Sequence, residues 1–242
     1  MTKDSENRTA SPPVALITGA SRGLGVAWAE ALGARGWHVV AVARTLGALE
    51  ELDDRITAQG GCATLAPMDL TQDDAIRHLC RGIHDRWGRV DLWAHTAMAA
   101  PPLSPAGHVA IKDWDRLLAS ALRTTGVMIP MIEPLLRAAP GCGTAVFFDD
   151  TSRLAEDGAA RPHFGAYAAA KAGQIALAQA WAAENAGLGP GRAPRVVIDR
   201  PAPMPTATRA RFFPGEPRDA LSPCADQAAR ALDALGVTRG AV

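Results

Sequence analysis

Tyr167 and Lys171 stand four residues apart in the stretch "YAAAK", a spacing that suggests acid–base chemistry. On a helix, residues i and i+4 lie on one face, so the phenol and the ammonium are expected side by side. A tyrosine ordinarily ionises near pH ~10, and a desolvated ammonium with a cofactor charge would lower the phenol pKa towards neutrality. The alternative is an exposed helix pair, which is worth only about 0.2–0.5 kcal/mol. The catalytic interpretation therefore requires a cofactor site elsewhere in the chain.

A glycine-rich turn supplies such a site. The segment "TGASRGLG" (18–25) follows an apolar run and precedes a helical pattern. Glycines there permit a tight turn, the approach of a pyrophosphate to a helix N-terminus, and close packing of helix on strand. The alternative is that they serve the turn alone. The candidate cofactor-binding residues in this turn are Gly19, Ser21, Arg22, Gly23, Leu24 and Gly25.

The elements around these residues alternate between strand and helix. Apolar runs predict strands at 14–18, 38–43, 62–67 (the weakest), 90–95, 144–149 and 195–199. Helical patterns lie at 24–35, 46–58, 72–87, 112–138, 165–187 and 224–235. The fold class is therefore α/β, with one Rossmann-type doubly wound domain over 13–242 and a flexible tail over 1–12. We expect a parallel sheet of six to seven strands, with helices on both faces and the ligand at the carboxyl ends of the strands.

The two motifs resemble those of the short-chain dehydrogenase/reductase family, TGxxxGxG followed by YxxxK, over residues 14 to 220. The resemblance implies hydride transfer between NAD(P)(H) and a small carbonyl or alcohol substrate. It implies that Tyr167 protonates the carbonyl oxygen, and that Lys171 holds the cofactor ribose and lowers the phenol pKa. The stretches "TRARFFPGE" (208–216) and "LAQAWAAENA" (177–186) are similar to a YciK-like bacterial subgroup.

The residues after the second strand indicate which dinucleotide is bound. Arg44 follows that strand where a carboxylate would grip a free ribose hydroxyl, and Arg22 lies in the glycine turn. Two guanidinium groups suit a 2′-phosphate, so NADP(H) is favoured over NAD(H), although two solvated arginines would look the same. By resemblance, Asp69 contacts the adenine; it could also be the N-cap of the next helix. The remaining candidate cofactor-binding residues are Leu70, His95, Pro201 and Thr206, the last for the nicotinamide carboxamide.

Three positions depart from the family pattern, and the active site is therefore expected to be partly degenerate. After the fourth strand, His95-Thr-Ala-Met replaces the usual Asn-Asn-Ala-Gly, and Ala121 stands where an asparagine supports a relay water. Asp150 takes the place of the family's serine by strand alignment, whereas Thr151 or Ser152 would do so by chemistry. We predict Ser152 as the catalytic hydroxyl, because a carboxylate would repel a developing oxyanion. His95 and His163 are expected near the nicotinamide, or else as structural residues.

Two classes of function fit these features. The first is an NADP-dependent oxidoreductase, supported by the glycine turn, Tyr167, Lys171 and Thr206. The second is a nucleotide-binding protein with weak or no hydride chemistry and a regulatory or structural role, supported by the altered residues. Lyase or isomerase chemistry on the same site is a smaller third possibility.

Composition limits the partners. The chain has 242 residues, 48% hydrophobic and 21% charged, with 25 basic and 25 acidic side chains that cancel. Zero net charge gives no case for nucleic acid or an anionic membrane, and no apolar leader or span is present. The cysteines at 62, 80, 142 and 224 lack paired spacing, which predicts free thiols, no metal and a cytoplasmic location. By resemblance we expect a homodimer or homotetramer built through 112–138 and 165–187.

Overall fold

Six short apolar segments form one parallel sheet in the computed structural model, which describes residues 11–155, 157–189 and 191–237. Their side chains are rich in valine, isoleucine, leucine and phenylalanine, as expected for strands buried on both faces. The strands are β1 (Val14–Thr18), β2 (His38–Ala43), β3 (Cys62–Pro67), β4 (Leu92–His95), β5 (Thr144–Phe148) and β6 (Arg195–Asp199). Their order in the sheet is β3-β2-β1-β4-β5-β6, so the chain reverses direction across the sheet after β3. This is the doubly wound arrangement that the sequence predicts.

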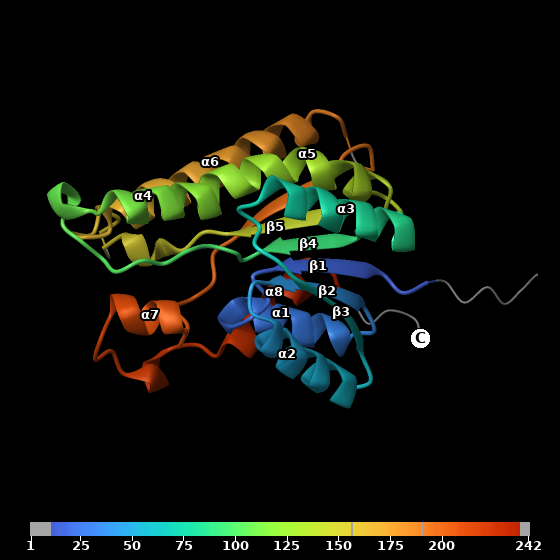
Figure 1. Cartoon of the computed structure of the whole chain (residues 1–242), viewed down its shortest axis with the longest axis horizontal. Helices are drawn as coiled ribbons and strands as arrows, with labels where there is room; N and C mark the ends of the chain where they lie inside the picture. The colour runs from blue at the N-terminus through green and yellow to red at the C-terminus, as the bar shows by residue number, and fades with distance from the viewer. Residues whose placement is uncertain (1–10, 156, 190, 238–242) are drawn as a thin grey trace, which may run out of the picture.

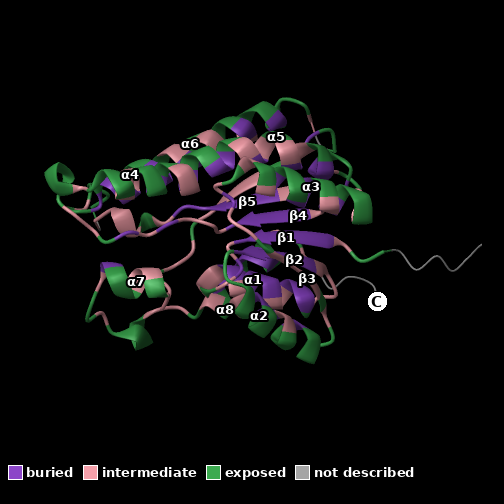
Figure 2. Ribbon diagram, viewed as in Figure 1, coloured by how far each residue is buried: buried purple, intermediate pink, exposed green. Residues whose placement is uncertain are grey.

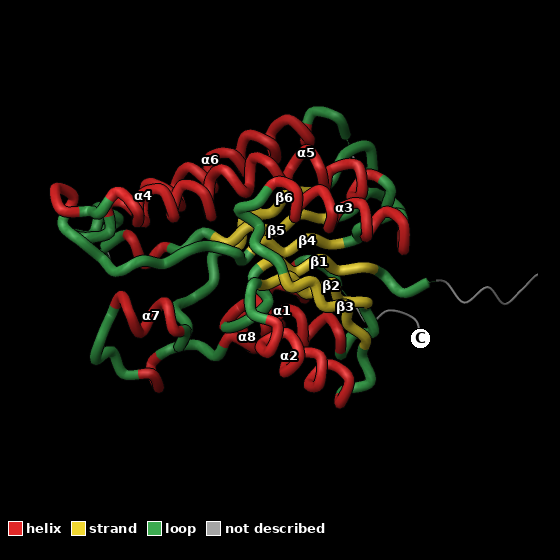
Figure 3. The backbone as a smooth tube through the Cα atoms, viewed as in Figure 1, coloured by secondary structure: helices red, strands yellow, loops and turns green. Residues whose placement is uncertain are grey.

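Helices cover both faces of the sheet (Figure 1). On one face lie α1 (Gly23–Gly33), α2 (Leu46–Ala58) and α8 (Cys224–Ala234). On the other lie α3 (Asp73–Trp87), α5 (Thr124–Arg137) and α6 (Gly165–Ala186), with α4 (Ile111–Leu118) leading into α5. The short helix α7 (Ala207–Phe212) stands apart, beyond the carboxyl ends of the strands (Figure 3). None of the described helices has both the length and the apolar character needed to cross a bilayer.

Alternate residues of the strands pack into two separate hydrophobic cores, one on each face of the sheet. Leu16 of β1 packs with the α3, α5 and α6 side chains, whereas its neighbour Ile17 packs with those of α1, α2 and α8. Figure 2 shows the central strands β1, β4 and β5 as mostly buried and the outer helix faces as exposed. Because both faces are covered, ligands can reach the sheet only at its ends.

The helix predicted over 112–138 contains an irregularity. Residues Ala119–Arg123 form a π-helical turn between α4 and α5, and Thr124 Oγ1 donates a hydrogen bond to Ala119 O at 2.8 Å. Such a turn inserts one extra residue into a helix and is frequent at functional sites.

Two further expectations concern the chain ends. The described part of the sheet has six strands, within the expected range of six to seven, and residues 238–242 lie outside the described residues. Of the predicted tail, residues 1–10 also lie outside them, whereas Ser11 and Pro12 accept hydrogen bonds from Arg89.

Candidate active site

One cavity of about 800 Å³ lies at the carboxyl ends of the strands. The loops after all six strands line it, as the doubly wound topology predicts. Every residue that the sequence analysis placed in the cofactor or catalytic site contributes to its wall. These are Gly19, Ser21, Arg22, Gly23, Leu24, Gly25, Arg44, Asp69, Leu70, His95, Ser152, Tyr167, Lys171, Pro201 and Thr206. His163 instead lines a neighbouring pocket of about 510 Å³.

The glycine turn after β1 is shaped by close packing. Gly19 has a φ of 89°, which disfavours other residues, and a Cβ there would lie 2.6 Å from Thr96 Oγ1 and 2.7 Å from Ala97 N. A Cβ on Gly25 would collide with the carbonyl oxygen of Gly19. The turn therefore requires glycine at both positions, and it directs the N-terminus of α1, at Gly23, towards the cavity. Such an N-terminus, with its free N–H groups, fits the pyrophosphate of a dinucleotide.

The end of β2 carries positive charge. Arg44 and Arg22 line the cavity, both are exposed, and neither guanidinium makes a hydrogen bond or ion pair within the described residues. Ala43 and Arg44 occupy the end of the strand, so no carboxylate follows it directly. The two guanidinium groups are therefore available to a phosphate-bearing ligand.

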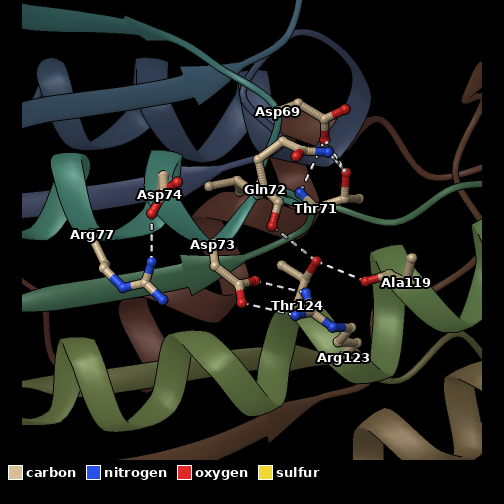
Figure 4. Close-up of polar contacts among 10 residues, drawn as sticks. Asp69, Thr71, Gln72, Asp73, Asp74, Arg77, Ala119, Arg123 and Thr124 are labelled. Atoms are coloured by element: carbon tan, nitrogen blue, oxygen red, sulfur yellow. Dashed lines mark hydrogen bonds and ion pairs between the residues drawn. The ribbon is translucent and has the colours of Figure 1, made fainter.

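The loop between β3 and α3 is tied to the π-helical turn (Figure 4). Asp69 Oδ1 accepts hydrogen bonds from Thr71 N at 3.0 Å and Thr71 Oγ1 at 2.9 Å. Thr124 Oγ1 donates to Leu70 O at 3.1 Å, and Arg123 forms a bidentate pair with Asp73 at 2.7 and 2.8 Å.

Asp69 is not the N-cap of α3, contrary to one of the two readings from the sequence. The helix begins at Asp73 with Gln72 as its N-cap residue, and the Asp69 carboxylate closes a short turn within the loop instead. The carboxylate faces the cavity, which leaves the adenine contact as the remaining prediction.

Tyr167 and Lys171 lie on the first two turns of α6, and each residue is 6% exposed. Tyr167 Oη donates a hydrogen bond to Asp150 Oδ2 at 2.7 Å. Lys171 Nζ donates to Phe148 O at 3.1 Å and to Gln174 Oε1 at 2.8 Å. Since an ammonium has three N–H bonds, one remains for a ligand in the cavity.

Burial and nearby charge move both pKa values. Burial, and then the Asp150 carboxylate, raise the Tyr167 pKa well above its usual value of 10.0. Burial lowers the Lys171 pKa to about 8, against the opposing pull of Asp150 and Asp149. The expected lowering of the phenol pKa by Lys171 is therefore not found, because the closest charge to the phenol is negative.

The Asp150 carboxylate, rather than a hydroxyl, occupies the position next to the Tyr167 phenol. Its other oxygen accepts from Ser152 N at 2.9 Å, which starts the short 3₁₀ helix Thr151–Arg153. Ser152, the predicted catalytic hydroxyl, lines the same cavity, but Tyr167 donates to Asp150 and not to it. Asp149, 3% exposed, is neutralised by Arg153 at 3.0 Å and Arg200 at 3.2 Å.

A buried polar network lies behind Lys171, and two of its members were missed by the sequence analysis. Gln174 Nε2 donates to Thr125 Oγ1 at 3.0 Å, and Thr125 Oγ1 lies 3.0 Å from His95 Nε2. His95 Nδ1 lies 2.7 Å from Thr18 Oγ1. Gln174 is 1% exposed and three residues after Lys171, a helix-face spacing that could have identified it.

The network fixes the state of His95. Burial first, and then the Lys171 charge, lower its pKa to about 3, so the imidazole is neutral near pH 7. His95 bridges two threonines at the cavity wall, and its predicted place near the nicotinamide stays a prediction.

The segment after β6 closes the far wall. Pro201 and Thr206 line the cavity, and Thr206 Oγ1 accepts from Arg209 N at 3.1 Å as the N-cap of α7. Arg209 pairs with Glu216 at 2.7 Å and stacks over Phe213. Phe212 packs edge-on against Tyr167, with ring centroids 4.9 Å apart.

Comparison with known proteins agrees with this geometry. The family model described as "short chain dehydrogenase" matches residues 13–214. The chain therefore belongs to the short-chain dehydrogenase family.

Two curated relatives show how far the similarity extends. A 3β-hydroxysteroid dehydrogenase 1 of Eggerthella lenta is 32% identical over 210 residues, covering 82% of this chain and 73% of the relative. A fatty acyl-CoA reductase of Acinetobacter baylyi is 45% identical over 84 residues, or 35% of this chain, and the match spans 28% of that relative's length.

Two solved structures resemble the whole fold. A metagenomic short-chain oxidoreductase in complex with NADP is 27% identical, has a TM-score of 0.74, and is matched over 93% of this chain and 90% of its own. The oxidoreductase yciK from Escherichia coli is 25% identical, with a TM-score of 0.79 and coverage of 91% and 88%.

Proposed function

We propose that this protein is an NADP(H)-dependent oxidoreductase that interconverts a small alcohol and its carbonyl compound. The observation that carries the proposal is the convergence of the glycine turn, two unpaired arginines and a buried Tyr–Lys pair on one cavity of about 800 Å³. Two solved relatives, the metagenomic enzyme and a Shigella flexneri short chain dehydrogenase, are NADP complexes, which supports the choice of dinucleotide.

The protein groups fit a dinucleotide along the length of the cavity. The N-terminus of α1 is placed to bind the pyrophosphate. A 2′-phosphate would be bound by Arg22 and Arg44, and the adenine end by Asp69 and Leu70. Lys171 offers its remaining N–H bond to a ribose hydroxyl, and Pro201 with Thr206 lies where the nicotinamide carboxamide would be held. When bound, the dinucleotide supplies the hydride donor or acceptor.

Tyr167 is the proposed acid–base group at the reacting oxygen, with Ser152 as a further proposed contact for that oxygen. Tyr167 packs against Phe164 and Phe212, which keep water from its ring.

Membership of the YciK-like subgroup and a cytoplasmic location remain predictions. So does assembly into a homodimer or homotetramer, for which the exposed Ile111, Leu118 and Leu122 offer a helical face.

The test is a titration of NADPH and NADH, followed by quenching of tryptophan fluorescence, on wild type and Arg44→Ala. We expect NADPH to bind more tightly than NADH, and Arg44→Ala to weaken NADPH binding about tenfold while NADH binding changes little. Arg77→Ala, which removes an exposed arginine of α3 away from the cavity, is the matched control. Absence of binding by either dinucleotide would refute the proposal and leave a protein with the family fold but without its redox role.

A further inference from the structure

The Tyr167 hydroxyl has a single polar partner among the described residues. Its proton lies on the hydrogen bond to Asp150 Oδ2, at 2.7 Å, and the aromatic rings of Phe164 and Phe212 flank the phenol. Any proton that Tyr167 exchanges must therefore move to a ligand in the cavity, to Asp150, or by way of Lys171 on the same helix face.

The protein groups that Lys171 contacts cannot take up a proton from it. The ammonium donates to the carbonyl oxygen of Phe148 and to the amide oxygen of Gln174. Neither a peptide nor a side-chain amide accepts a proton near neutral pH. The orientation of the Gln174 amide follows from its partners, because an ammonium only donates and so must face the amide oxygen.

The donors and acceptors beyond Gln174 are also all engaged in hydrogen bonds. Thr125 Oγ1 donates to Ala121 O at 2.6 Å and accepts from Gln174 Nε2 at 3.0 Å. This makes His95 Nε2 the donor to Thr125 and His95 Nδ1 the acceptor from Thr18. No position in this chain of contacts is left to receive a proton from Lys171.

Asp150 is hydrogen-bonded directly to the phenol and also opens on the cavity. It lines the wall and is only partly buried, and Ser152 N holds its second oxygen at 2.9 Å. A carboxylate in this position can accept the phenol proton and pass it to water in the cavity.

We propose that Asp150 is the proton-exchange partner of Tyr167, and that the two residues form a phenol–carboxylate dyad that carries protons between the substrate and solvent. The proposal rests on the proposed oxidoreductase function. As an alcohol is oxidised, its hydroxyl proton moves to Tyr167 Oη while the phenol proton moves to Asp150 Oδ2. The hydride from the carbinol carbon passes to the oxidised nicotinamide dinucleotide, and Asp150 then releases its proton to water. Carbonyl reduction runs through the same atoms in reverse.

The charges around the phenol explain why such a dyad is needed. Burial, Asp150 and Asp149 raise the Tyr167 pKa, and Arg153 opposes them only in part. Lys171 lies on the same helix, and Arg209 acts on Asp150 from α7. A free phenolate is therefore unfavourable near neutral pH, and simultaneous transfer to Asp150 avoids forming one.

Tyr167 is the only tyrosine of the chain, which gives a test that needs neither cofactor nor substrate. Protein labelled with ¹³Cζ-tyrosine should show one tyrosine resonance. We expect that resonance to shift in wild type below pH ~5, where carboxylates protonate, and to report ionisation of the phenol only at strongly alkaline pH. In Asp150→Asn the acid shift should vanish and phenol ionisation should move to lower pH. Asp157→Asn, an exposed carboxylate of the same loop, should keep both features.

A resonance in Asp150→Asn that keeps the acid shift would overturn the proposal. If that variant does not fold, Asp150→Ser serves for the same measurement, since serine is smaller and still accepts a hydrogen bond.

The second measurement uses an alcohol that wild type oxidises. We expect Asp150→Asn to lower kcat about 10²-fold with little change in KM, and small carboxylate buffers such as formate to restore part of the rate. Unchanged kcat would overturn the dyad. Fluorescence titration of NADPH on wild type and on the same variant separates the two proposals. Absent binding in wild type refutes the redox function, whereas the tyrosine resonance still decides the dyad.

Discussion

The two halves of the sheet differ in what holds their functional residues. In the half proposed to bind the cofactor (the cofactor half, β1–β3 with α1 and α2), the turn after β1 is shaped by backbone, with glycines at Gly19 and Gly25 where no Cβ fits. In the catalytic half (β4–β6 with α4–α6), side chains form the site, through the Tyr167–Asp150 bond and the network behind Lys171. A turn shaped by close backbone packing tolerates few substitutions, whereas the hydrogen bonds between side chains can change with the fold intact.

The largest effect is expected from Tyr167→Phe in the catalytic half. Loss of the acid–base hydroxyl should lower kcat by about 10²–10⁴-fold, because proton transfer to the reacting oxygen loses its partner. NADPH binding, measured by fluorescence, should stay close to that of wild type, since the ring and the cofactor half are retained. A variant that turns over at the wild-type rate would show that the phenol is not the acid–base group.

A smaller but still large effect is expected from Gly19→Ala in the cofactor half. The added Cβ would meet the Thr96–Ala97 backbone at a φ of 89°, and strain and overlap together should cost about 3 kcal/mol of unfolding free energy. Urea unfolding followed by tryptophan fluorescence measures this loss. The matched control is Gly47→Ala in α2, where a Cβ meets nothing within 4 Å. It should be neutral or stabilising by up to about 1 kcal/mol. Equal stabilities of the two variants would contradict the packing of the turn.

The third prediction concerns acid stability, which the neutral His95 should govern in part. Its pKa in the folded protein, about 3, lies below the ordinary 6.5, so the unfolded chain binds the proton first. The stability that His95 contributes is complete above pH 6.5 and is lost as the pH falls towards 3. Between pH 6.5 and 4.5 the loss should be about 2–3 kcal/mol.

The substitution His95→Gln should flatten this decline in the unfolding free energy, because glutamine does not titrate and can still bridge Thr18 and Thr125. His78→Gln, at an exposed position of α3, is the control and should keep the wild-type slope. An unchanged slope in His95→Gln would show that the folded protein accommodates a charged imidazole.

The sequence predicted the fold, and which residues line the cavity, well, for physical reasons. The strand pattern and the glycine spacing are local signals, and the topology then brings the ends of all the strands to one cavity. Every predicted strand is present, with ends displaced by at most two residues.

The catalytic half was predicted less completely, because its contacts join residues distant in sequence. The bond between Tyr167 and Asp150 spans 17 residues, and that between Gln174 and Thr125 spans 49. Ser152 was preferred on the chemistry of its hydroxyl, but the backbone after β5 turns the Asp150 carboxylate towards the phenol and uses Ser152 N to hold it. Only the three-dimensional arrangement shows the resulting rise in the phenol pKa.

The π-helical turn at Ala119–Arg123 has a consequence for engineering this chain. Because the turn carries one residue more than an α-helical turn, deleting a single residue there would restore a regular helix. A deletion elsewhere in α4 or α5 would instead rotate everything beyond it by roughly 100° about the helix axis. After such a deletion, Thr124 and Thr125 could not face Leu70 and Gln174 while Leu117 keeps its present orientation in the core. A one-residue deletion should therefore be better tolerated within the π-helical turn than elsewhere in these two helices.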